Sequence, residues 1–443
     1  MRSPSSPVFL ALADVLISAL VVAPLVVAYW RGTWQVVDAH LVPLVGDSLS
    51  GWLSFAFGII VHLVFALLQP LLNLAPLRPR ATFLVLSRAY TALFGIACVN
   101  CWRGVWKVLD HELGITPMAD AASFAGALLA LALTRTLRNV SAPPFVVALD
   151  DAVNYFKFPT AFRTRISPAE NGCRQIETKD SEAPYRQHRR SLFARAGRAS
   201  WYALRYGVDC IISVVVIGTL VVVVWRGAWY LLDRLLFPEK PEWSAWGSLV
   251  LGYSITIFVF SLQIPAQVLC ARLKHSFLRL VTADTFIFLS FCGTVNVWRG
   301  VWNLLNLFLL PDLPLMSNWL THVVSLLVLM LLHCSNSILV RGVWLDGEEK
   351  KGACVVFPVL YIRHYSKKQH MGENHGTPSE EEMQTVKQGD AVHPLMSNHH
   401  HRSQDMKTSH REKEEGSSQV RRDSPHAPLT PDVTREIIIA RTT

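Results

Sequence analysis

The pentapeptide WRGTW at residues 30–34 returns as WRGVW at 102–106, WRGAW at 225–229 and WRGVW at 298–302. The amino-acid composition gives a chance expectation of about 0.002 copies in a chain of this length, so four copies indicate an internal repeat. The first two copies are spaced by 72 residues and the last two by 73, and equivalent copies in the two halves by 195 and 196. This spacing predicts a tandem duplication, with two copies of the motif in each half.

Each pentapeptide is followed by a further polar residue, eight positions after its first tryptophan. Residues i, i+4 and i+8 lie along one face of a helix, so both tryptophans and this residue are predicted to share a face. The repeated motif comprises Trp30, Arg31, Gly32, Trp34 and Asp38; Trp102, Arg103, Gly104, Trp106 and Asp110; Trp225, Arg226, Gly227, Trp229 and Asp233; and Trp298, Arg299, Gly300, Trp302 and Asn306. The asparagine of the fourth copy departs from the aspartate of the other three.

Long apolar runs surround these motifs. Of the 443 residues, 51% are hydrophobic and only 17% charged, and the mean hydropathy is +0.30, which excludes an ordinary soluble protein. A helix needs about 20 apolar residues to cross ~30 Å of hydrocarbon. Runs of that length occur at 8–28, 52–74, 82–101, 119–138, 208–225, 246–268, 277–297 and 318–340. We therefore expect an all-α membrane protein with eight transmembrane helices, four in each repeat.

The basic residues, which give the chain a net charge of +9, concentrate in alternate loops. Thirteen lie between Arg135 and Arg205, whereas the loop around Arg31 holds one. Because positive loops are retained in the cytoplasm, both termini are predicted to be cytoplasmic. The chain then divides into a first four-helix repeat at 1–140, a cytoplasmic loop at 141–206, a second four-helix repeat at 207–346 and a polar, disordered cytoplasmic tail at 347–443.

Every motif copy ends a predicted span on the exoplasmic side. In one interpretation the tryptophans form an aromatic belt among lipid headgroups and the arginines snorkel beside them. In the other, the four arginines form a ring that is a site for a ligand, an ion or a partner. Each arginine would then be held by cation–π contact with tryptophan and by a carboxylate one or two turns further on. The glycines are expected to let another backbone approach closely.

Ionisable residues inside the predicted spans are candidates for function. Four lie near the cytoplasmic edge: Asp14, Arg88, Asp209 and Asp284. Buried charges tend to pair, so an ion-paired cluster linking the two halves is one hypothesis. Independent hydration of each residue at the interface is the alternative. Three histidines lie in apolar runs and could relay protons, although a lone helical histidine more often bonds a neighbouring hydroxyl or carbonyl: His62, His322 and His333.

The sequence predicts no cofactor and no metal. The eight cysteines are scattered and most lie in apolar runs, which argues against a disulfide framework. Cys98 and Cys101 are one helical turn apart, but no further ligands accompany them. The chain has no Walker motif, catalytic triad, HExxH or dinucleotide fingerprint, and nothing in it resembles a nucleic-acid module. We therefore expect neither an enzyme nor a nucleic-acid-binding protein.

Residues 186–205 form a basic amphipathic segment with six arginines and no acid. The candidate contact residues of this segment are its arginines and one tryptophan: Arg186, Arg189, Arg190, Arg195, Arg198, Trp201 and Arg205. The segment is suited to lie on anionic inner-leaflet lipids, at about 1 kcal/mol per basic residue, or to bind a calmodulin-like partner. A topology signal without a partner is the third interpretation.

The four WRGxW copies with their trailing Asp or Asn, on eight spans with cytoplasmic ends, resemble the Fuseless family of insect and other invertebrate membrane proteins. The resemblance covers residues 8–345. It implies a non-enzymatic multi-pass protein of the presynaptic plasma membrane that organises voltage-gated calcium channels at active zones and supports calcium-dependent vesicle exocytosis. Calcium-channel subunits and presynaptic proteins would be its partners, besides the lipid bilayer. The competing hypothesis is a solute or ion transporter or channel, with a path between the two four-helix halves.

Overall fold

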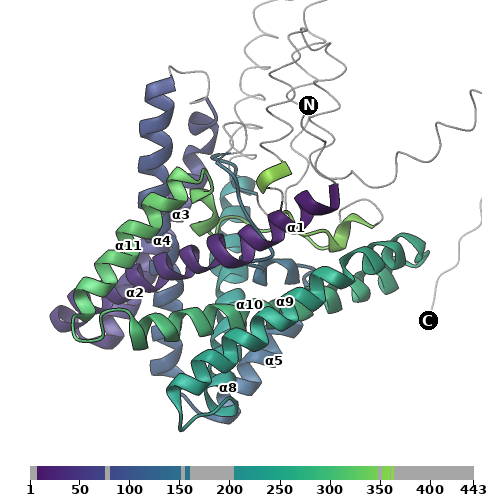
Figure 1. Cartoon of the computed structure of the whole chain (residues 1–443). Coiled ribbons are helices and arrows are strands. Elements are labelled where there is room, and N and C mark those ends of the chain that lie inside the picture. Colours follow the sequence, from purple (N-terminus) through teal and green to yellow (C-terminus); the bar gives the residue numbers. More distant parts are fainter. Residues whose placement is uncertain are drawn as a thin grey trace, which may run out of the picture. The chain divides into compact units, whose positions relative to one another are not determined.

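Figure 1 shows the computed structural model of the chain, which describes residues 7–74, 80–150, 155–159, 204–347, 352–359 and 361–363. These residues all belong to one compact unit, Met1–Thr377, and they form helices and connecting loops without a β-strand. The predicted all-α class is confirmed. The basic segment 186–205 lies outside the described residues up to position 203, as does the tail beyond position 363.

Four long helical stretches carry the motif copies. The first stretch, Phe9–Val45, runs through α1 (Pro7–Ile17), a π-helical turn η1 (Ser18–Val22) and α2 (Ala23–Val45). The third stretch, Leu204–Leu235, includes a π-helical turn η4 (Ile212–Ile217) and α8 (Gly218–Leu235). The second and fourth are single helices, α4 (Arg80–Glu112) and α10 (Ser276–Phe308). Each stretch has 32 to 37 residues. At 1.5 Å per residue this is on the order of 50 Å, so the stretches exceed the hydrocarbon thickness and must tilt or project beyond it.

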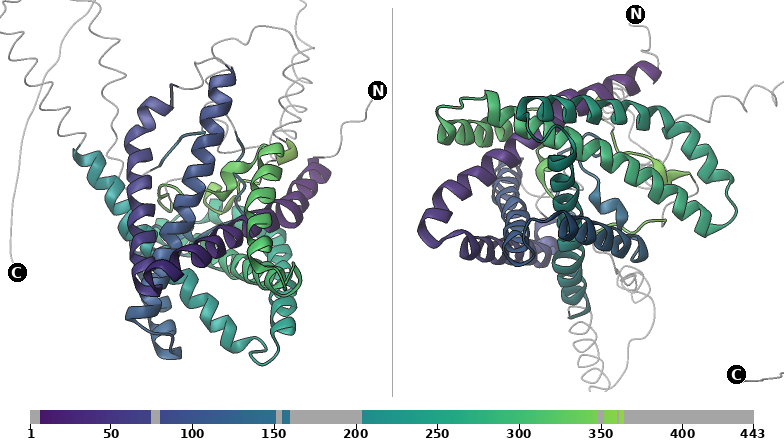
Figure 2. Two further views of the ribbon diagram at one scale, coloured as in Figure 1. Left: turned by 90° about the vertical axis from the view of Figure 1, so that its left-hand side faces the viewer. Right: turned by 90° about the horizontal axis from the view of Figure 1, so that it is seen from below.

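Each long stretch packs against one shorter helix. The shorter helices are α3 (Asp47–Leu72), α5 (Pro117–Leu133), α9 (Pro241–Arg272) and α11 (Pro314–Leu331). The pairs are α3 with α4, α5 with α8, α9 with α10, and α11 with α2, so the last of the shorter helices pairs with the first motif helix. Figure 2 shows these pairs from two further directions. Three of the shorter helices start with proline, whose missing N–H costs nothing at a helix N-terminus.

The number of candidate membrane spans among the described residues depends on the length of the shorter helices. Seven helical stretches are long and apolar enough to cross a membrane, against eight predicted. The exception is α5, an apolar helix of 17 residues that overlaps the predicted span 119–138 and ends five residues before it. It ends before Arg135, whose φ of 56° turns the chain away from the helix axis. The eight-span count and the duplication therefore remain predictions.

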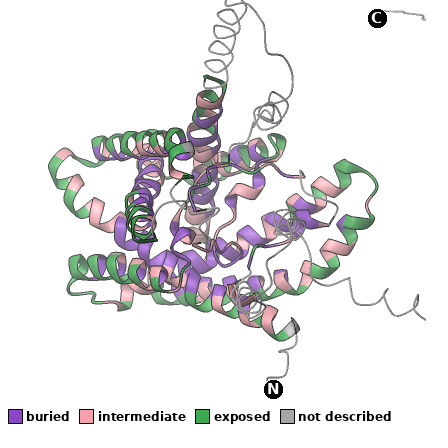
Figure 3. Cartoon of the chain, turned by 90° about the horizontal axis from the view of Figure 1, so that it is seen from above, coloured by how far each residue is buried: buried purple, intermediate pink, exposed green. Residues whose placement is uncertain are grey.

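The chain segments that follow α5 and α11 run antiparallel and contact each other along their length. Two short 3₁₀ helices, η3 (Leu137–Val140) and η5 (Ser335–Ile338), open these segments. The Asp150 carboxylate accepts from the N–H of Asn336 in η5 at 2.9 Å, and the Asp346 carboxylate accepts from the N–H of Leu137 in η3 at 2.7 Å. Burial raises the pKa of Asp346, and the η3 N–H donors oppose this rise. A carboxylate of each segment thus caps the short helix of the other segment. Figure 3 shows that buried residues are concentrated where the helices meet.

The packed body continues past residue 346, where we predicted that the tail begins. Residues of η6 (Ala353–Val355) are buried, and Phe357 stacks on Phe286 of α10 with centroids 5.4 Å apart. The Asp14 carboxylate accepts from the backbone N–H of Ile362 and from Arg363 Nε, the latter at 2.6 Å. Residues 352–359 and 361–363 therefore belong to the folded body.

The third motif residue, glycine, sets how closely the helices of each pair approach. A Cβ atom on any of the four would collide with the backbone or the Cβ atom of a residue on the paired helix: Gly32 with Asn318 and His322, Gly104 with Phe55, Gly227 with Phe124, and Gly300 with Leu249. The predicted close approach is therefore present at every copy. No other residue fits without moving the helices apart.

Replacing Gly104 by alanine is expected to destabilise the protein by about 1–3 kcal/mol, because the new methyl group overpacks the interface between α3 and α4. The measurement is thermal unfolding of the detergent-solubilised protein followed by size-exclusion chromatography. Gly126→Ala in α5 is the matched control, since nothing lies within 4 Å of its Cβ position. Equal stability of the two variants would contradict the close-approach role.

Candidate functional site

The first tryptophans of the four motif copies pack into a closed ring where α2, α4, α8 and α10 meet. The ring centroids of neighbouring members are 5.2 Å apart for Trp30 and Trp102, 5.6 Å for Trp102 and Trp225, 5.3 Å for Trp225 and Trp298, and 5.7 Å for Trp298 and Trp30. All contacts are edge to face, the geometry that aromatic pairs prefer and that contributes about 0.5–1.5 kcal/mol per pair beyond area burial. This first tryptophan ring joins the four long helices.

The second tryptophans of the motif form another closed ring one helical turn away. Its neighbouring centroids are 5.7 Å apart for Trp34 and Trp106, 6.1 Å for Trp106 and Trp229, 5.9 Å for Trp229 and Trp302, and 6.0 Å for Trp302 and Trp34. These contacts are again edge to face. The spacing of four residues in the motif therefore produces two stacked rings around one axis.

A small cavity lies between the first tryptophan ring and the two antiparallel segments that follow α5 and α11. Its volume is about 80 Å³, and its lining includes Trp102, Asn139 and Asn336. Three indole N–H groups donate to carbonyls of those segments: Trp30 to Ile338, Trp225 to Val140 and Trp298 to Pro143. The Asn336 side chain is 2% exposed, and neither its amide nitrogen nor its oxygen has a partner among the described residues. The cavity can therefore hold water or a small polar molecule.

The motif arginines form a cycle of hydrogen bonds between helices. Arg103 of α4 donates from Nε and Nη2 to one carboxylate oxygen of Asp38 on α2, at 2.9 and 2.6 Å. The other three copies follow the same order, with Nε as donor: Arg226 to Asp110 (2.8 Å), Arg299 to Asp233 (2.7 Å) and Arg31 to Asn306 (2.7 Å). Each arginine thus bonds the eighth-position residue of the preceding copy, and the fourth copy closes the cycle with the first.

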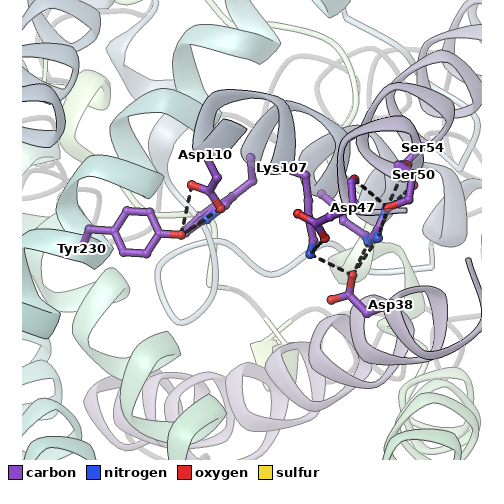
Figure 4. A network of polar contacts seen from close by, with 9 residues as sticks. Asp38, Asp47, Ser50, Ser54, Lys107, Asp110 and Tyr230 are labelled. Atoms are coloured by element: carbon purple, nitrogen blue, oxygen red, sulfur yellow. Dashed lines mark hydrogen bonds and ion pairs between the residues drawn. The ribbon is translucent and has the colours of Figure 1, made fainter. Parts of the chain in front are cut away.

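The paired shorter helix supplies the remaining acceptors for each arginine. Arg103 Nη1 donates to Ser54 Oγ at 2.6 Å, and Nη2 donates to Ser50 Oγ at 2.8 Å. Figure 4 shows these serines of α3 beside Asp38, with Asp110 and Tyr230 belonging to the next position of the cycle. The corresponding acceptors are Ser244 and Ser248 for Arg299, Ser317 and Thr321 for Arg31, and Asp120 for Arg226. All four arginines are between 0% and 4% exposed.

These serines were not among the predicted site residues, although the sequence contains a pattern that marks them. Ser-x-Trp-x-Ser/Thr occurs at 50–54, 244–248 and 317–321, at the start of three of the shorter helices. The fourth position has Asp120 instead, and this buried carboxylate also binds Arg234 at 2.5 Å. The Arg226 position therefore carries two carboxylates, whereas the Arg31 position carries none among the described residues.

Burial overturns the aromatic-belt interpretation of the motif. Trp30, Trp225 and Trp298 are 3–7% exposed, the other motif tryptophans are only partly exposed, and the four arginines are at most 4% exposed, so the arginines do not snorkel. The helices also continue past the motif, as α2 does to Val45, because the arginines find their acceptors inside the protein. Three of the exposed tryptophans lie in the Ser-x-Trp-x-Ser/Thr segments: Trp52, Trp246 and Trp319. These residues are the ones placed to anchor the helices at a lipid interface.

The predicted arginine ring is present, but its partners differ from those expected. The carboxylate comes from the neighbouring helix and not from the next turns of the same helix. Among the described residues the motif arginines make no cation–π contact with tryptophan; Arg226 lies over the Tyr230 ring, with its guanidinium carbon 4.9 Å from the centroid. Hydrogen bonds and ion pairs, and not indole faces, therefore hold the guanidinium groups.

The structure does not assemble the predicted cluster of Asp14, Arg88, Asp209 and Asp284. Arg88 pairs with Asp150, which lies in the segment that follows α5, with an Nη1 to Oδ2 distance of 2.6 Å. Asp14 pairs with Arg363, and Asp284 makes no ion pair within the described part of the chain. The cluster hypothesis, which would pair Arg88 of the first half with Asp284 of the second, is therefore wrong for these two residues. Asp150 was missed because it lies in a loop outside the predicted spans.

The histidines and cysteines of the apolar runs bond to their immediate surroundings. His62 contacts the carbonyl oxygens of Gly58 and Val340 at 2.7 and 3.1 Å, and His322 contacts the Thr33 hydroxyl at 2.8 Å. Cys98 Sγ donates to the Val340 carbonyl at 3.3 Å. No group of three metal-ligating side chains occurs among the residues that the structure describes.

The long apolar helices around this buried motif define a helical membrane protein with several spans and a core of stacked tryptophan rings. A sequence model of the Fuseless family matches residues 9–171 and 180–339, so the chain belongs to the Fuseless family. The resemblance stated from the motif is thereby confirmed. Searches among curated proteins and among solved structures gave no match.

Removing the Asp38 carboxylate is expected to destabilise the protein by about 3–5 kcal/mol, because Arg103 stays buried without its charged partner. The variant is Asp38→Ala, and the measurement is thermal unfolding in detergent. Asp312→Ala, outside the arginine cycle, should unfold like the wild type. A double variant that also carries Arg103→Met should lose less than the two single losses together, and full additivity would argue against the pair.

The corrected partner of Arg88 can be tested by charge reversal. Arg88→Asp should lower the yield of folded protein, because it removes the positive partner of the buried Asp150 carboxylate and adds a second negative charge to the site. Adding Asp150→Arg should restore part of the folded protein, since it returns the ion pair but not the acceptor of the Asn336 N–H, whereas adding Asp284→Arg should restore none. The readout is the monodisperse fraction in size-exclusion chromatography. Rescue by the second combination and not by the first would restore the discarded pairing.

Proposed function

We propose that this protein is a non-catalytic multi-pass protein of the plasma membrane that organises voltage-gated calcium channels at presynaptic active zones. In this role it supports calcium-dependent vesicle exocytosis. The observation that carries the proposal is membership of the Fuseless family over two segments that include all four motif copies. Both termini would be cytoplasmic, with calcium-channel subunits and presynaptic proteins as partners.

The geometry supports a scaffold because the repeated side chains of the motif are used inside the protein. The tryptophans contact one another and the arginines contact neighbouring helices, so few of these groups face outward. The outward faces of α3, α5, α9 and α11 are apolar instead: exposed residues include Leu53, Leu129, Val250 and Leu327. Such faces can pack against lipid or against the helices of a membrane partner.

The proposal is tested by affinity capture of the intact protein from nerve-terminal membranes, scored for calcium-channel subunits. A second form should end at residue 363, because the folded body extends that far. Channel recovery with both forms would assign the contact to the body, and recovery with the intact form alone would assign it to residues 364–443. Good recovery of the protein without channel above a mock capture would contradict the proposal.

Transport is the second candidate, and the cavity beside the first tryptophan ring is the observation that favours it. The cavity is lined by residues of both halves, including Asn336, whose side-chain nitrogen and oxygen have no partner among the described residues. A transporter would have to open the ring, because edge-to-face indoles with centroids 5.2–5.7 Å apart occupy its axis. Liposomes containing the purified protein distinguish the candidates: flux that is lost in Asn336→Leu supports transport, and no flux of any tested ion or solute supports the scaffold.

A further inference from the structure

The arginine cycle is regular in geometry but uneven in charge. Three of its four arginines donate to a carboxylate, whereas Arg31 donates to the carboxamide of Asn306. The cycle and its ion-paired neighbours include the cations Arg31, Arg103, Lys107, Arg226, Arg234 and Arg299, and the carboxylates Asp38, Asp47, Asp110, Asp120 and Asp233. The single excess positive charge lies at Arg31.

Arg31 is buried among neutral groups. It is 4% exposed; its Nε donates to Asn306 Oδ1 at 2.7 Å, and its Nη1 donates to the hydroxyls of Ser317 and Thr321 at 3.2 and 3.4 Å. Its remaining nitrogen, Nη2, has no partner among the described residues. A buried cation without a counter-charge is costly, and such charges in membrane proteins are normally paired.

Arg103 shows what the Arg31 position lacks. At Arg103, both Nε and Nη2 reach the Asp38 carboxylate, so this edge of the guanidinium group is saturated with acceptors. A carboxamide offers one oxygen and one NH₂ group, and a guanidinium group can only donate. Once Arg31 Nε takes the Asn306 oxygen, Arg31 Nη2 and Asn306 Nδ2 are the donors that these two side chains have left over. No acceptor among the described residues meets either of them.

The second of these donors, Asn306 Nδ2, belongs to an exposed residue. Asn306 lies near the C-terminal end of α10 and is exposed, on the side of the membrane that the charge distribution predicts to be exoplasmic. A water molecule there would satisfy the donors but would leave the charge of Arg31 unbalanced. A small anion satisfies both requirements.

We propose that Arg31 and Asn306 form a binding site for a small monovalent anion, with chloride as the probe. The anion accepts hydrogen bonds from Arg31 Nη2 and Asn306 Nδ2 and supplies the negative charge that aspartate provides in the other copies. The site lies where α2 meets α10 and α11, which is the closure of the cycle between the first and last motif helices. Anion binding therefore stabilises the closed ring of helices.

The test is thermal unfolding of the purified full-length protein in nanodiscs, in sodium chloride and in sodium gluconate at equal ionic strength. The wild type is expected to unfold at a temperature higher by about 2 °C or more in chloride, with a saturable dependence on its concentration. Asn306→Asp should unfold at the same temperature in both salts, because its carboxylate replaces the anion. Equal unfolding temperatures of the wild type in the two salts would overturn the proposal.

Two further variants keep the test independent of the folding of Asn306→Asp. Asp233→Asn reproduces the same carboxamide at Arg299 and should enlarge the response to chloride. Asp312→Asn, which lies outside the cycle, should respond like the wild type. A chloride response that persists unchanged in Asn306→Asp would identify a general salt effect, and this result would also overturn the proposal.

Discussion

Four buried guanidinium groups constrain this fold more than any other feature. An arginine cannot lose its charge inside a protein, so each of the four must be surrounded by acceptors. Those acceptors lie on other helices: an eighth-position residue of the preceding motif helix and polar side chains of the paired shorter helix. Because every arginine needs the helix before it, the helices satisfy all four only by closing into a ring.

The other motif residues make that closure possible. Glycine allows the paired helix to approach until its serines reach the guanidinium group, as Gly104 does for Ser50 and Ser54. The two tryptophans fill the axis that the ring of helices encloses. One short motif therefore sets helix spacing, axial packing and cyclic order, and it leaves the outward faces of the shorter helices for lipid or partners.

Much of this arrangement was predictable from the sequence, but the direction of the contacts was not. Periodicity placed Trp30, Trp34 and Asp38 on one helix face, and the structure keeps them there. It could not tell whether Asp38 serves its own helix or the next one, since that depends on how helices are ordered in space. Burial of the tryptophans was equally ambiguous, because indoles serve both cores and headgroup belts. Asp150 escaped notice because span prediction ignores loops, although it neutralises Arg88.

The most direct test of the account is a cryo-EM map of the purified protein in nanodiscs at a resolution that shows side chains. We predict density joining Arg103 to Asp38, Arg226 to Asp110 and Arg299 to Asp233 between neighbouring helices, around two stacked rings of four indoles. Arginine side chains that point to the lipid headgroups, or that bond the carboxylate of their own helix, would contradict the account.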